Sequence, residues 1–170
     1  MDYGEGKTMI SDEINSIINE QINKEFYSGY LYLSKSAHLK ELGLMGFASW
    51  LRHQAKEEVE HGLKLLDYLL ERNSFVTLKQ IRTPEFEFNG IISIFNKIYE
   101  HEKCITESVM KVAKTAEEEC DRTTLSFIDW FIQEQIEEEQ NIKNIIKRLE
   151  LFGDEKTSLF LLDKELGERA

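Results

Sequence analysis

The sequence predicts an all-α protein, a four-helix bundle with one long crossover connection and a short fifth helix. Three observations predict this fold. Of the 170 residues, 41% are hydrophobic, 31% are charged and only 1 is proline, a mixture rich in helix-forming side chains. Long segments carry apolar residues at the three-and-four spacing of amphipathic helices. A stretch without this period, 73–88, separates the second such segment from the third.

Signals in the sequence predict where the first two helices begin and end. Ser11 is a favourable N-cap, and Asp12 and Glu13 follow it in the first turn, where negative charge stabilises a helix. This helix should end near Glu41, because Gly43 provides a stop signal. The second helix should then extend over 44–72.

The connection over 73–88 determines the topology. A helix over 44–72 is roughly 40 Å long at ~1.5 Å per residue, and about 15 extended residues span roughly 50 Å at ~3.3 Å each. The connection can therefore return along the whole bundle and place the third helix parallel to the second. The short links within each helix pair should make both pairs antiparallel hairpins.

The third, fourth and fifth helices are predicted from similar signals. The third should run from an N-cap at Asn89 to about residue 116, and the fourth over 121–151. Gly153 should end the fourth helix, and Asp154 can cap a short fifth helix that reaches about residue 166. The segment SLFLLDKEL in this helix is apolar around its whole circumference, so it needs a partner surface.

Composition excludes several classes of function. The net charge of −11 argues against non-specific binding to nucleic acid or to an anionic membrane, and no apolar run approaches the ~20 residues that span a bilayer. Residues 1–8 lack the features of a secretory signal, so we expect a flexible extension or an expression remnant there, followed by one domain over 9–170. Cys104 and Cys120 form no disulfide framework, which favours a cytoplasmic location.

Each long helix has polar residues near the middle of its core-facing stripe. For a single glutamate, the simpler interpretation is a buried residue with a hydrogen-bond partner or a misjudged helix register. Interruptions at similar depth on all four helices need another explanation. The polar residues are Glu25 on the first helix, Glu58 and His61 on the second, Glu102 on the third, and Gln135 and Glu138 on the fourth.

The four glutamates would bring four negative charges to one place in the core. Burying an ionised carboxylate costs several kcal/mol, and no lysine or arginine lies on the stripes at this level. Two divalent cations would balance the charge. One imidazole nitrogen with several carboxylate oxygens suits iron, manganese or zinc better than calcium. The pattern therefore predicts a dinuclear metal site.

These motifs resemble those of ferritins of the bacterial non-haem type. A glutamate from each of two helices together with Glu-x-x-His motifs is typical of ferritin-like di-metal bundles. The resemblance rests on EQINKEFYSGYLY (20–32), QAKEEVEH (54–61), YEHEK (99–103) and FIDWFIQEQIEEE (127–139). The segment LDKELG (162–167) is also similar to the short fifth helix of that family.

The resemblance implies roles for the interrupting residues. Glu25, Glu58 and His61 resemble the ligands of one iron. Glu102 and Glu138 resemble those of a second iron, with Glu58 bridging the two and Gln135 nearby. The fourth helix has Gln135-x-x-Glu138 where a Glu-x-x-His motif would place a histidine, so the second iron should be held more weakly.

Further residues match positions around that site. Glu57, Glu134 and Glu137 match carboxylates that bacterial ferritins use for a third iron position, although a solvated charged face is the alternative. Tyr32 matches a tyrosine that could hydrogen-bond a ligand, donate an electron or simply pack.

Other positions argue against a haem group and against further histidine ligands. Val59 stands where haem-binding bacterioferritins have a methionine ligand, so we expect no haem. The remaining histidines lie off the stripes and should be at the surface; they are His38, His53 and His101.

The function that the resemblance implies is iron storage with ferroxidase activity. Fe(II) would be oxidised by O2, or by H2O2, and stored as a ferric mineral inside a shell of 24 subunits. One alternative is a di-iron oxidase or peroxidase of the rubrerythrin kind, without storage. Another is a metal-free helical scaffold, and a mini-ferritin of 12 subunits would leave the fifth helix unexplained.

Overall fold

The structure, a computed structural model, describes residues 9–85, 89–152 and 155–168. The expected extension at 1–8 and the helix signals Gly153 and Asp154 lie outside the described residues.

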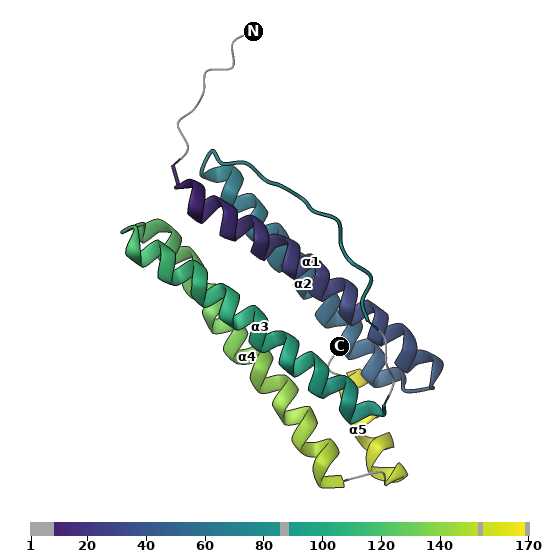
Figure 1. The fold of residues 1–170 in the computed structure, drawn as a ribbon. Helices are drawn as coiled ribbons and strands as arrows, with labels where there is room; N and C mark the ends of the chain where they lie inside the picture. The colour runs from purple at the N-terminus through teal and green to yellow at the C-terminus, as the bar shows by residue number, and fades with distance from the viewer. Residues whose placement is uncertain (1–8, 86–88, 153–154, 169–170) are drawn as a thin grey trace.

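Five helices make up the described fold. They are α1 (Asp12–Glu41), α2 (Met45–Glu71), α3 (Ile91–Glu118), α4 (Arg122–Phe152) and α5 (Lys156–Glu168). Figure 1 shows α1 and α2 as one antiparallel hairpin and α3 and α4 as a second, with a long connection running back beside α1 so that α3 is parallel to α2. The predicted four-helix bundle with a crossover and a short fifth helix is confirmed. None of the described helices is long and apolar enough to cross a membrane.

Polar side chains cap the starts of α1 and α4, the first of them at a predicted N-cap. Ser11 Oγ accepts a hydrogen bond from the Ile14 amide at 3.0 Å, as its position predicts. Asp121 Oδ1 accepts amide hydrogen bonds at the start of α4 in the same way. The predicted N-cap at Asn89 is wrong, because α3 begins after Gly90, which makes no side-chain cap. Gly90 has a φ of 91°, a left-handed conformation that glycine adopts without strain.

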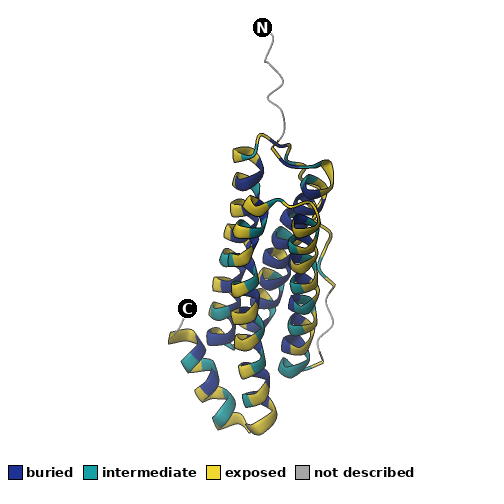
Figure 2. Cartoon of the chain, turned by 90° about the vertical axis from the view of Figure 1, so that its left-hand side faces the viewer, coloured by how far each residue is buried: buried dark blue, intermediate teal, exposed yellow. Residues whose placement is uncertain are grey.

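Buried apolar side chains form two clusters, one toward each end of the bundle. One contains Ile18, Leu69 and Phe131, and the other contains Leu51 and Phe95. Buried residues follow the inward face of each long helix in Figure 2. Along all four long helices, the polar residues that interrupt the stripe fall between the residues of the two clusters. The core is therefore divided by one polar layer.

The crossover is attached to α1 by three asparagines spaced four residues apart, Asn15, Asn19 and Asn23. Asn19 donates to the Phe75 carbonyl at 2.8 Å and accepts from the Thr77 amide at 2.6 Å. Asn23 likewise donates to the Thr77 carbonyl at 3.0 Å and accepts from the Lys79 amide at 2.6 Å. These bonds satisfy backbone groups that a long connection without secondary structure would otherwise leave to water.

Replacing Asn19 tests this attachment. Asn19→Ala should lower the free energy of unfolding by about 2 kcal/mol, since two side-chain hydrogen bonds to the crossover are lost. Hydrogen exchange at the Thr77 amide should accelerate, whereas Glu20→Ala, a change at an exposed neighbour, should leave it unchanged. Unaltered protection of Thr77 in the Asn19 variant would contradict the assignment.

Close backbone packing holds α5 against the start of α2. A β-carbon added to Gly46 would lie only 1.5 Å from the Asp163 carbonyl oxygen, so this approach requires glycine. Asp163 Oδ1 accepts the Phe47 amide hydrogen bond at 2.9 Å and thereby satisfies one of the free amides at the N-terminus of α2. Arg148 and Glu165 form two further hydrogen bonds between α4 and α5, at 3.0 and 2.6 Å.

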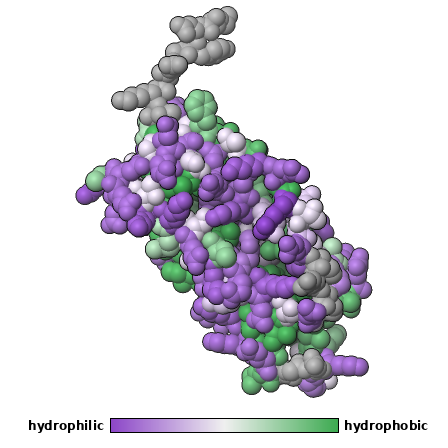
Figure 3. Space-filling view, in the orientation of Figure 1, coloured by the Kyte–Doolittle hydropathy of each residue, from purple (hydrophilic) through white to green (hydrophobic). Residues whose placement is uncertain are grey.

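The apolar surface of α5 is only partly covered within one chain. Leu162 and Leu166 are buried, but Phe160 remains 66% exposed and Leu161 59%. Hydrophobic atoms gather at the same end of the molecule in Figure 3. Part of the apolar surface of α5 is therefore uncovered within one chain. The sequence predicted that this helix would need a partner surface.

Candidate metal centre

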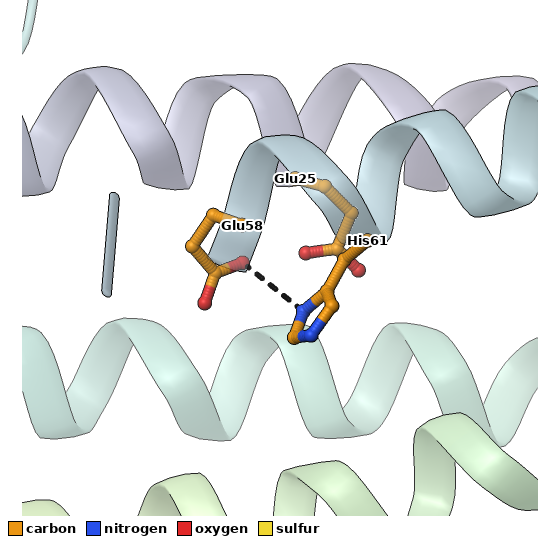
Figure 4. Close-up of side chains that lie close together, drawn as sticks. All are labelled: Glu25, Glu58 and His61. Atoms are coloured by element: carbon orange, nitrogen blue, oxygen red, sulfur yellow. Dashed lines mark ion pairs between the residues drawn. The ribbon is translucent and has the colours of Figure 1, made fainter. Parts of the chain in front are cut away.

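Three buried side chains converge in one half of the polar layer. Glu25 comes from α1, and Glu58 and His61 come from α2, where the three-residue spacing places both on one face. One ligand atom from each lies within 4.8 Å of the others. The Nδ1 atom of His61 is 3.8 Å from Glu58 Oε2. Figure 4 shows all three side chains in the space between the α1–α2 hairpin and α3.

The other half of the layer is built from α3 and α4. Glu102 accepts hydrogen bonds from the Tyr32 hydroxyl and from Gln135 Nε2, the latter at 3.1 Å. Glu138 Oε1 accepts a weaker bond from Gln54 Nε2 at 3.3 Å. All five side chains are buried. Glu102 and Glu138 are not part of the 4.8 Å cluster of Glu25, Glu58 and His61, but they lie in the same layer and face it.

The acidic residues around Glu138 are more accessible. Glu57 and Glu134 are half-buried, and Glu137 is exposed. Burial is the largest cause raising the pKa of Glu138, and the charge of Glu102 is the next. The charges of these three carboxylates add to both, and together they raise this pKa to about 8. These three carboxylates therefore act electrostatically on the layer from its edge.

Burial makes ionisation of the central carboxyl groups unfavourable. It is the largest cause raising the pKa of Glu25, Glu58 and Glu102, and the charge of a neighbouring carboxylate adds to it for each of the three. The hydrogen bonds from Tyr32 and Gln135 partly oppose the shift at Glu102. Burial and the charges of Glu102, Glu58 and Glu138 also raise the pKa of the Tyr32 phenol. Without a cation, these groups retain protons at pH values where exposed glutamates have lost theirs.

Several oxygens in the layer have no hydrogen-bond donor among the described residues. They are buried atoms of three of the carboxylates, namely Glu25 Oε2, Glu58 Oε1 and Glu138 Oε2. Leaving a buried acceptor unsatisfied costs about 1–3 kcal/mol. A divalent cation accepts such lone pairs, and the donor set of carboxylate oxygens with one imidazole nitrogen fits a first-row transition metal. The residues present therefore suit iron.

Two glutamines orient the carboxylates and were not assigned this role from the sequence. Gln21 Nε2 donates to Glu25 Oε1 at 2.7 Å from a fully buried position one turn earlier on α1. Gln54 donates to both Glu57 and Glu138. The sequence pattern could have indicated a role for Gln54, because this residue lies on the core-facing stripe of α2, one turn before Glu58.

The histidines outside the layer differ in how far they are buried. His53 is exposed, as predicted, but His38 and His101 are half-buried, so the expectation of surface positions is wrong for these two. His101 Nε2 lies 2.7 Å from Ser28 Oγ. Burial, with the charges of Arg82 and Lys24, lowers the pKa of His101 to about 4.

Comparison with known proteins shows the family to which this chain belongs. Residues 15–152 match the family model described as the ferritin-like domain. The chain belongs to the ferritin family. It is 38% identical over 156 residues to the bacterial non-heme ferritin of Campylobacter jejuni, covering 92% of this chain and 93% of that one. It is 31% identical over 161 residues to the bacterial non-heme ferritin of Staphylococcus aureus, covering 95% and 97%.

Solved ferritin structures share the whole fold. The crystal structure of an open-pore ferritin from the archaeon Archaeoglobus fulgidus superposes with a TM-score of 0.93 at 37% identity, covering 96% of this chain and 99% of that chain. The correspondence includes the helical hairpins, the crossover and the region of α5, because nearly all of both chains is matched.

The stability of the metal-free ferritin should fall as the pH rises. Glu138 keeps its proton in the folded state up to about pH 8, whereas its ordinary value is 4.5. Between these values unfolding releases a proton, so the free energy of unfolding falls by about 1.4 kcal/mol per pH unit for one such group. Melting temperatures measured with a chelator present should decline across this window.

Glu138→Gln should make that decline shallower, because it removes one of the groups that titrate. Glu107→Gln, which changes an exposed carboxylate on α3, is the matched control and should reproduce the unmodified profile. Identical pH profiles for the Glu138 variant and the unmodified protein would show that burial of this carboxyl group does not limit stability.

Proposed function

We propose that this protein oxidises Fe(II) to Fe(III) with O2 at a di-iron centre and stores the product as hydrated ferric oxide inside a homo-oligomeric shell. The observation that carries the proposal is the buried cluster of Glu25, Glu58 and His61, which faces Glu102 and Glu138 and contains carboxylate oxygens without donors. Membership of the ferritin family and the similarity to bacterial non-heme ferritins support it.

The two irons are substrates and would have unequal ligands. Glu25, Glu58 and His61 would bind the first Fe(II), and the second would lie between Glu58, Glu102 and Glu138, with Glu58 as the bridge. Two divalent ions balance four carboxylates. The second site lacks a histidine, so its iron would be held more weakly and would leave more readily after oxidation.

The carboxylate ligands favour oxidation. Negatively charged oxygen donors stabilise Fe(III) more than Fe(II), which lowers the reduction potential of the bound iron. Two adjacent Fe(II) ions can together deliver two electrons to O2. Gln21 holds the Glu25 carboxylate by a hydrogen bond, and Tyr32 and Gln135 hold that of Glu102. Tyr32 is therefore proposed mainly as a residue that positions a ligand, and its contact also leaves it close enough to serve as an electron donor.

The carboxylates at the edge of the layer are proposed as a third iron position. Gln54 donates hydrogen bonds to Glu57 and Glu138 and so connects this edge with the centre. Glu134 and Glu137 lie close enough to affect the pKa of Glu138. Oxidised iron leaving the weaker site would meet these carboxylates first on its way to the mineral.

The assembly is expected to be a shell of 24 subunits in the cytoplasm. The exposed Phe160 and Leu161 on α5 provide apolar surface that contact between subunits would cover. We expect no haem, because the relatives are named non-heme ferritins and Val59 has no side-chain atom that could bind haem iron.

The proposal is tested by loading the metal-free protein with Fe(II) under anaerobic conditions and then admitting air. About two irons per subunit should be oxidised rapidly, followed by slower growth of ferric absorbance within a large particle. Glu58→Ala removes the bridging ligand and should lower the initial rate by about 100-fold or more, since even outer contacts to metal ligands contribute 10–100-fold. Glu107→Ala, at an exposed position, should oxidise iron at the unmodified rate.

The iron capacity distinguishes the alternatives. Loading well beyond two irons per subunit supports storage. Tight binding that never exceeds two would instead indicate a di-iron oxidase or peroxidase of the rubrerythrin kind. Absence of binding would mean that the polar layer is structural, and the proposal would fail.

A further inference from the structure

A second candidate site lies where α1, the crossover and α3 meet. A cavity of about 390 Å³ is lined there by side chains of all three segments. Its volume falls within the range of pockets that bind small molecules, roughly 300–1,000 Å³. Residues of the crossover line one side of this cavity. Figure 1 shows the crossover running alongside α1, to which Asn23 attaches it.

The lining of the cavity is basic, although the protein is strongly acidic. Lys24, Lys79 and Arg82 contribute positive charge, and none of the described residues that line it is acidic. The whole chain has a net charge of −11. The lining of this cavity is therefore positive in a protein that is negative overall.

These three cations have no carboxylate partner among the described residues. Lys24 Nζ donates to Ser108 Oγ at 2.7 Å. The Arg82 guanidinium lies 4.5 Å from the centre of the Tyr27 ring. Lys79 is held through its backbone amide, which donates to Asn23 Oδ1 at 2.6 Å. The charged groups thus remain available to an anion, while the backbone and the aromatic ring that support them are already in place.

The rest of the lining offers contacts for an organic group. Ile81 from the crossover, which is 37% exposed, provides apolar surface. Tyr27 is supported on one side by the edge of His101, with ring centres 5.6 Å apart. We propose that this cavity binds a small phosphate-bearing molecule, with the phosphate dianion between Lys24, Lys79 and Arg82. Charge-assisted hydrogen bonds to phosphate are stronger than neutral ones, and arginine can form two in parallel.

The site is separate from the metal centre, although the two share helices. Lys24 and His101 line the cavity, and the residues that follow them, Glu25 and Glu102, belong to the polar layer. Consecutive helical residues point about 100° apart, so the cavity and the layer face different sides of α1 and α3. Binding in the cavity requires no ligand of the metal centre.

Calorimetric titration of the assembled, metal-free protein at low ionic strength tests the proposal. Iron is removed because ferric ions bind phosphate themselves. Inorganic phosphate and adenosine 5′-monophosphate are the two probes, and at least one should bind with one site per subunit. Lys79→Gln and Arg82→Gln should each weaken binding about 10-fold or more, because each removes a charge-assisted hydrogen bond to the phosphate. Lys111→Gln, at an exposed position elsewhere on α3, should bind like the unmodified protein.

The two probes identify the source of the phosphate group. Tighter binding of the nucleotide supports a phosphate ester whose organic part contacts Ile81, and equal binding supports free phosphate. The proposal is overturned if neither probe binds, or if the Lys79 and Arg82 variants bind as well as the Lys111 control. Arg82→Lys, which keeps the charge, should retain more affinity than Arg82→Gln if electrostatic attraction is the cause.

Discussion

The constraint on which the structure depends is the burial of four carboxylates in one layer of a helical core. Glu25, Glu58, Glu102 and Glu138 separate two apolar clusters that together would otherwise form one continuous core. Their raised pKa values show that the protein alone does not stabilise four charges there. Cations stabilise the ionised form, so the same arrangement that weakens the metal-free fold would favour binding of the iron that we propose there.

The remainder of the fold keeps these carboxylates in position. The apolar clusters on both sides determine how the four helices align, and therefore how the layer is assembled from residues distant in sequence. The crossover allows the two hairpins to pack with α2 parallel to α3, and Asn15, Asn19 and Asn23 attach it to α1. Gly46 and Asp163 fix α5 at the opposite end. The proposed metal site and the exposed apolar surface of α5 therefore lie in different parts of one chain.

The sequence predicts the long helices and the buried glutamates, because amphipathic helices have a strong period and a glutamate on an apolar stripe interrupts it. It predicts less where a role depends on contacts between segments. The role of Asn19 cannot be predicted from the helical period, because its hydrogen-bond partners Phe75 and Thr77 belong to the crossover. Gln21 is an ordinary helical residue until its contact with Glu25 is seen. The prediction of an N-cap at Asn89 is wrong because Gly90 provides the required backbone conformation instead.

Anomalous diffraction at the iron absorption edge, from crystals soaked anaerobically in Fe(II), tests the central claim most directly. The account predicts two peaks per subunit within the polar layer, one in contact with Glu25, Glu58 and His61 and the other with Glu58, Glu102 and Glu138. Glu58 should contact both. Iron found only on exposed carboxylates, with the layer free of anomalous density, would contradict it.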